Sequence, residues 1–179
     1  MADDNSTPEP TPEPTPEPTP EPTPALVQHG VVLHHFDSGR ICCEMPYEHG
    51  VLQGEGKMYY TNGGLYARET YARDVLNGPT ALYYPDGVLQ AELEYLDGLL
   101  EGTSKEYFIT GRLESVSEYR RGKKNGFTVV YAETGVIESR VYYVDDSITV
   151  PPAAETPPVE TPAAETPAAA PAAQGPATR

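Results

Sequence analysis

YLDGLLEGTSKEYFITGRLESVSEYRRGKKNG, residues 95–126, begins and ends with two related phrases, YLDGLLEG and YRRGKKNG, which lie 24 residues apart. The same step relates five segments of the chain without insertion or deletion. Each segment opens on a glycine, at Gly30, Gly54, Gly78, Gly102 and Gly126. Each also keeps a second glycine (Gly39, Gly63, Gly87, Gly111 and Gly135) and a tyrosine (Tyr47, Tyr71, Tyr95, Tyr119 and Tyr143). A period of this length indicates a repeat architecture.

Each 24-residue unit has the pattern of a β-hairpin. Residues 89–95, LQAELEY, alternate apolar with polar side chains, which is the period of a half-buried strand. The dipeptides Asn62-Gly63 and Asp86-Gly87 precede such strands, and both accept the positive φ that tight hairpin turns require. No segment has helical periodicity. We therefore predict an all-β fold, an elongated antiparallel sheet of five hairpins whose units start at residues 30, 54, 78, 102 and 126.

One face of this sheet is predicted to carry three columns of side chains at once. They are the tyrosines above, a small-residue column (Cys43, Ala67, Ala91, Ser115 and Ser139) and a branched aliphatic column (Ile41, Leu65, Leu89, Leu113 and Ile137). Residues 25–28 are expected to cap the first unit. Asp145-Asp146, which ends the fifth unit, is expected to act as a polar stop.

Two proline-rich tails flank the repeats. Residues 1–25 contain the run TPEPTPEPTPEPTPEP, and residues 150–179 repeat ETP between alanines and prolines. Such segments have too little apolar surface to offset the entropy of ordering, so we expect both to be disordered spacers. The predicted organisation is a tail at 1–25, a repeat domain at 26–149 and a second tail at 150–179.

The repeated phrases resemble a known family. The pattern Y-x-x-G-x-x-x-G, as at residues 95–102, and the pattern Y-Y-x-x-G-x-L, as at residues 83–89 and 59–65, are similar to the MORN repeat and more closely to its variant form. That variant form occurs in bacterial proteins labelled YwqK-type antitoxin components. The resemblance covers residues 30–146 and implies a β-hairpin repeat scaffold.

The charge balance limits the classes of partner. The whole chain carries a formal net charge of −15, and residues 26–149 carry 18 acids against 11 bases. This balance argues against a general nucleic-acid binder. One basic cluster, formed by Arg120, Arg121, Lys123 and Lys124, is a candidate contact for an anion or a partner.

The sequence offers no catalytic constellation. It has no G-x-S-x-G, Walker, H-E-x-x-H or paired C-x-x-C motif, and the constant spacing leaves no inserted loop. We therefore expect no enzyme activity, no cofactor and no small-molecule substrate. The first unit is the exception in composition, because it holds both cysteines and all four histidines. If His34 faces Cys42 with His29 nearby, these three side chains form a minor candidate set for a metal ion.

The preferred interpretation is a non-enzymatic scaffold that binds another protein, with antitoxin-like binding implied by the resemblance. The alternative is a module that associates with a membrane surface through its basic cluster. No run of residues approaches the ~20 apolar positions of a membrane helix. The N-terminus lacks the basic and apolar parts of a secretory signal, so we expect a cytoplasmic protein.

Overall fold

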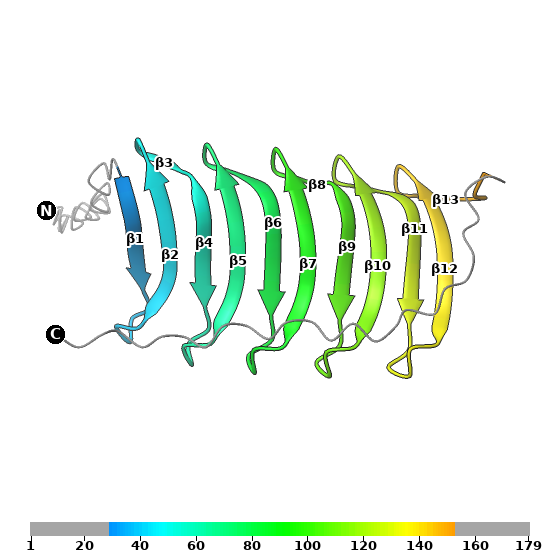
Figure 1. Ribbon diagram of the computed structural model, residues 1–179, viewed down its shortest axis with the longest axis horizontal. Coiled ribbons are helices and arrows are strands. Elements are labelled where there is room, and N and C mark those ends of the chain that lie inside the picture. Colours follow the sequence, from blue (N-terminus) through cyan, green and yellow to red (C-terminus); the bar gives the residue numbers. More distant parts are fainter. Residues whose placement is uncertain (1–28, 153–179) are drawn as a thin grey trace, which may run out of the picture.

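A computed structural model describes residues 29–152, which form one antiparallel sheet of thirteen strands (Figure 1). The strands are β1 (His29–His35), β2 (Ile41–Glu48), β3 (Val51–Leu52), β4 (Gly54–Tyr59), β5 (Leu65–Ala72), β6 (Val75–Tyr83), β7 (Leu89–Leu96), β8 (Leu99–Leu100), β9 (Gly102–Tyr107), β10 (Leu113–Arg120), β11 (Lys123–Tyr131), β12 (Ile137–Val144) and β13 (Ser147–Thr149). The all-β, antiparallel prediction is confirmed. No helix within the described range is long and apolar enough to cross a membrane. The predictions for the two tails and for a cap at residues 25–28 fall outside that range.

The strands follow one another through the sheet in chain order, so each hairpin pairs with the next along the long axis of the molecule (Figure 1). The short strands β3 and β8 pair with β2 and β7 and precede β4 and β9. Glu101, which separates β8 from β9, still donates its N–H to the Glu94 carbonyl at 2.9 Å. The corresponding strands β6 and β11 run without a break.

Two kinds of turn connect the strands. The turns between successive hairpins have positive φ at both central residues, as at Asp97 (49°) and Gly98 (79°), which is the conformation of a type I′ turn. This turn matches the right-handed twist of the flanking strands. Two of the other turns, those within the hairpins, contain the predicted dipeptides Asn62-Gly63 and Asp86-Gly87. There the Gly63 N–H reaches the Tyr60 carbonyl at 2.8 Å, and Gly63 has a φ of +90°.

The first glycine and the tyrosine of each unit are partners across the ladder. The pairs are Gly30 with Tyr47, Gly54 with Tyr71, Gly78 with Tyr95, Gly102 with Tyr119 and Gly126 with Tyr143. A Cβ built on Gly56 would lie 3.3 Å from Cε2 of Tyr71, so this ring extends over the glycine-containing strand. Aromatic side chains can compensate in this way for the packing that glycine fails to supply. The first glycine and the tyrosine that recur in the sequence are therefore backbone partners in the ladder.

A β-bulge in each hairpin separates the columns that were predicted to share a face. In β6 and β7, Leu82 pairs with Ala91, whereas its neighbour Tyr83 pairs with Leu89. Neighbouring strand residues point to opposite faces, so Leu89 and Ala91 do so as well. The prediction of a single inward face was therefore wrong. We call the side with Ala91 and Tyr95 the tyrosine–glycine face, and the side with Leu89 and Tyr83 the leucine face.

The core is thin because the described residues form a single layer. The main cluster lies on the leucine face and consists of Leu65, Tyr83, Leu89 and Tyr107, with Tyr59, Ala81 and Leu113 packed against it. On the tyrosine–glycine face the buried positions are mostly small, such as Ala67, Ala91, Thr80 and Ser104. A single hairpin is marginal on its own, so the packing of neighbouring hairpins supplies the stability of such an array.

Candidate functional site

The tyrosine–glycine face presents a row of half-buried aromatic rings. Tyr47, Tyr71, Tyr95, Tyr119 and Tyr143 recur on alternate long strands of the sheet. Carboxylates lie among them: the Tyr71 hydroxyl donates to Glu69, and the Ser115 hydroxyl donates to Glu106 at 2.8 Å. Burial raises the pKa of Tyr71, and the bond to Glu69 raises it further. This face therefore combines aromatic surface with a few acceptors and small side chains.

On the leucine face, tyrosine hydroxyls bond to carboxylates of the preceding hairpin. Tyr59 donates to Glu44 at 3.0 Å, and Tyr107 donates to Glu92 at 2.8 Å. Burial, with a smaller contribution from the bond to Glu44, raises the pKa of Tyr59 to about 12. These phenols act as hydrogen-bond donors in their neutral form. The same bond occurs in two places along the sheet, which indicates a structural role for these two tyrosines.

In two units, a second tyrosine in the turn joins the unit to the next one. The Tyr60 hydroxyl donates to the carbonyl of Tyr83 at 2.7 Å, and the Tyr84 hydroxyl donates to the carbonyl of Tyr107 at 2.9 Å. The repeated Tyr-Tyr dipeptides at residues 59–60 and 83–84 are the sequence signal of this link. Sequence reasoning used them for the family resemblance and missed the contact.

Aspartates form a similar link at the type I′ turns. Asp74 exchanges two bonds with Leu52: its Oδ1 accepts the Leu52 N–H at 2.7 Å, and its own N–H donates to the Leu52 carbonyl at 3.1 Å. Asp146 does the same with Lys124, at 2.8 Å and 3.0 Å. The predicted polar stop at Asp145-Asp146 is therefore wrong, because this turn has the geometry of the others and leads into β13.

The predicted basic cluster gathers at the type I′ turn between β10 and β11. Arg120, Arg121 and Lys123 are exposed, whereas Lys124 is half-buried with its Nζ 5.3 Å from the centroid of the Tyr143 ring. Acids lie directly beside it: the Glu101 carboxylate accepts the Arg121 N–H at 2.7 Å, and Asp146 accepts that of Lys124. The predicted cluster therefore lies in a single turn, and the carboxylates of Glu101 and Asp146 lie among its basic residues.

The predicted metal set is not brought together. His34 pairs with Cys43, and Cys42 is the extra residue at the bulge, so the expected pairing of His34 with Cys42 was wrong. The two thiol sulfurs lie 3.3 Å apart, and burial, followed by the bond to Cys42, raises the pKa of Cys43 to about 11. His29 lies at the opposite end of β1, roughly 17 Å along the strand from His34.

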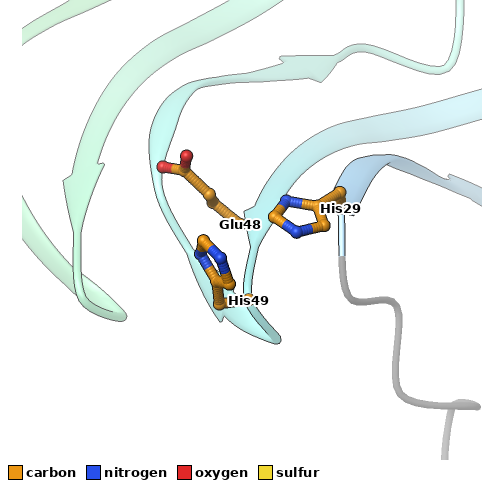
Figure 2. A group of neighbouring side chains, drawn as sticks. All are labelled: His29, Glu48 and His49. Carbon is orange, nitrogen blue, oxygen red and sulfur yellow. The ribbon is translucent and has the colours of Figure 1, made fainter.

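Instead, His29 meets Glu48 and His49, where β1 begins and β2 ends (Figure 2). One donor atom from each side chain lies within 4.8 Å of the other two, and all three residues are exposed. The two imidazole rings are in edge contact, with centroids 4.4 Å apart and an interplanar angle of 73°. Sequence reasoning named His29 and missed its two neighbours.

Comparison with known proteins identifies the hairpins. The family model described as the MORN repeat variant matches residues 52–72 and 76–97. No curated protein matches the chain at a significant level. Each matched segment corresponds to one hairpin between successive type I′ turns, the first containing β4 and β5 and the second containing β6 and β7. The chain therefore contains MORN repeats of the variant type, in the hairpins at residues 52–72 and 76–97.

Proposed function

We propose that this chain is a non-catalytic repeat scaffold that binds another protein across its tyrosine–glycine face. The observation that carries the proposal is the row of five half-buried tyrosines along that face. No second layer within residues 29–152 covers these rings. Tyrosine is enriched at protein interfaces, where its ring supplies apolar area and its hydroxyl retains a polar contact.

The length of the row favours a macromolecule over a small ligand. Neighbouring tyrosines of the row are two strands apart, or about 10 Å, so the five rings extend over roughly 40 Å. Standard protein interfaces have comparable dimensions, whereas small-molecule sites are concave and compact. An extended protein surface or an added strand is therefore the kind of partner that matches this row.

The charge of the chain favours a basic partner. A net charge of −15 attracts positively charged proteins over a long range and accelerates their encounter with the scaffold. Neutralisation of a toxin is the form of binding that the resemblance to antitoxin components implies. The Arg120–Lys124 turn supports membrane association less well, because Glu101 and Asp146 accept backbone bonds within it.

Two neighbouring positions on β7 provide a test of the face. Tyr95 lies on the tyrosine–glycine face, and Glu94 is exposed on the leucine face. A photo-crosslinking phenylalanine derivative at position 95 of the full chain should capture one defined basic protein in native cells, and the same group at position 94 should not. Capture from position 94 alone would contradict the proposed face.

The membrane alternative requires a separate measurement. Vesicles containing anionic lipid should not sediment the chain at physiological salt. Salt-sensitive sedimentation that is lost in the Lys123→Glu, Lys124→Glu variant would instead support the basic cluster as a membrane contact.

A further inference from the structure

The group formed by His29, Glu48 and His49 departs from the repeat at the first edge of the sheet. His29 is the first residue of β1 and pairs directly with Glu48, the last residue of β2. His49 follows in the type I′ turn with a φ of 52°. The same turn positions are filled by Arg73, Asp97, Arg121 and Asp145 in the other units, so histidine is not required for the turn.

The repeat geometry itself brings the two histidines together. In three other units, the residues equivalent to His29 and His49 are hydrogen-bonded across the same 20-residue separation. Gln53 Oε1 accepts the Arg73 N–H at 3.1 Å, Asn77 Nδ2 donates to Asp97 Oδ1 at 3.1 Å, and Glu101 Oε2 accepts the Arg121 N–H at 2.7 Å. The first unit has two imidazoles at this position, and the fold therefore holds two metal-type ligands side by side before any ion binds.

We propose that His29, Glu48 and His49 bind a divalent transition-metal ion of the zinc class. Two imidazole nitrogens and a carboxylate oxygen are ligands that zinc accepts in tetrahedral sites. With metal–donor distances of about 2.0–2.1 Å, the donors of such a site lie ~3.4 Å apart. The present separations are within 4.8 Å, and the side chains are exposed, so rotation about their side-chain bonds can close the difference. A water molecule would fill the fourth position.

Metal binding by His29, Glu48 and His49 would stabilise the pairing of β1 with β2 in the first hairpin. Within the described range β1 pairs only with β2, and Val31 and Leu33 of β1 are exposed. An ion held by His29 and by the β2–β3 turn would tie the start of this edge strand to its neighbour. Ligands that bind only the folded state raise its stability with concentration, so zinc should raise the unfolding temperature of the chain.

The test uses the tag-free, full-length chain in metal-free buffer. Zinc titrated calorimetrically should bind with one equivalent per chain. His49→Asn removes the imidazole while keeping a residue that tolerates a positive φ, and Glu48→Gln removes the charge while keeping the side-chain shape. Each variant should weaken zinc binding at least roughly 10- to 100-fold, the loss known even for residues that only support a metal ligand. Circular dichroism confirms that both variants remain folded.

Matched controls lie in the same hairpin. His34→Asn and the pair Cys42→Ser, Cys43→Ser change three of the metal-type side chains at the far end of this hairpin, and both variants should leave zinc affinity unchanged. Cobalt bound to the wild-type chain should show no thiolate charge-transfer band. The proposal is overturned if micromolar zinc does not bind, if His49→Asn binds as tightly as the wild type, or if the cysteine variant alone loses the ion.

Discussion

The central hairpin β6–β7 and the first hairpin β1–β2 share one register but differ in burial. In the centre, Tyr83 and Leu89 are each 5% exposed. At the equivalent positions of the first hairpin, His35 is exposed and Ile41 is only half-buried. Each pair is joined across the same kind of bulge, Tyr83 to Leu89 and His35 to Ile41. The difference therefore arises from neighbours, because the central hairpin is flanked by others on both sides.

This contrast explains where the sequence is free to vary. A central unit needs its tyrosine and leucine, since the adjoining units pack against them. The first unit has, within the described range, a neighbour on one side only, so it tolerates His35 where the other units keep tyrosine. The same freedom allows histidines at positions 29 and 49, whose equivalents in three other units are hydrogen-bonded to each other.

Truncation of a side chain in the aliphatic column should give the largest difference in stability loss between the two hairpins. Leu89→Ala removes a side chain from the centre of the buried cluster, and we expect it to lower the free energy of unfolding by about 3 kcal/mol. Ile41→Ala, at the half-buried edge position, should cost only about 1 kcal/mol because less area is removed from contact. Urea unfolding followed by circular dichroism measures both. Equal losses would show that burial by neighbours does not set the energetics.

Substitution of the first glycine of a unit should give a second, smaller difference in stability loss, between Gly30 at the edge and Gly126. Gly126 and Gly30 have nearly the same backbone, with φ of +122° and +126°. A Cβ at Gly126 would lie 2.8 Å from Cβ of Glu118, whereas a Cβ at Gly30 meets nothing within 4 Å. Gly30→Ala should therefore cost only the backbone strain, about 1–2 kcal/mol. Gly126→Ala adds a steric clash to that strain, for a total of about 2–3 kcal/mol.

The control for this pair is Gly54→Ala. Gly54 also has positive φ (+102°), and the nearest atoms to its Cβ would be those of Pro46 at 3.8 Å, an ordinary contact. It should behave like Gly30 in thermal unfolding, although it lies inside the array. A loss at Gly54 as large as that at Gly126 would assign the effect to position in the array and would contradict the steric explanation.

The features that could be predicted from the sequence are those that depend on residue types recurring at fixed intervals. The 24-residue step, the hairpins and the Asn-Gly and Asp-Gly turns all follow from residue types that accept positive φ or alternate in polarity. The assignment of faces failed because strict alternation was carried through the bulge. A single extra residue, such as Gln90 between Leu89 and Ala91, transfers one column to the other face.

The candidate site was harder to predict because its residues are close only through the turn. His29 and His49 are 20 residues apart, and neither belongs to a recognised ligand spacing. Their proximity becomes visible when the equivalent pairs, such as Asn77 with Asp97, are seen to bond in the folded sheet. In the sequence these pairs share only their separation, since their residue types differ from unit to unit. Sequence reasoning therefore grouped His29 with His34 and Cys42, which lie near the other end of the first hairpin.

The hydroxyl of Tyr59, which joins the first two hairpins, should show the smallest effect and one that depends on pH. Tyr59→Phe removes the bond to Glu44 and should lower the free energy of unfolding by about 1 kcal/mol at neutral pH. The folded state raises the pKa of Tyr59 to about 12, above the value near 10 of an unfolded chain. The neutral phenol therefore contributes its full stability below about pH 10, and that contribution disappears as the pH rises through about 12. The wild type should lose stability over this window more steeply than Tyr59→Phe, so the free energies of unfolding of the two proteins should converge at alkaline pH.

Urea unfolding at a series of pH values, with phenolate absorbance to follow the ionisation of tyrosine, measures this convergence directly. A constant difference between the two proteins across the window would show that Tyr59 ionises equally in both states and that its bond to Glu44 does not hold the phenol neutral.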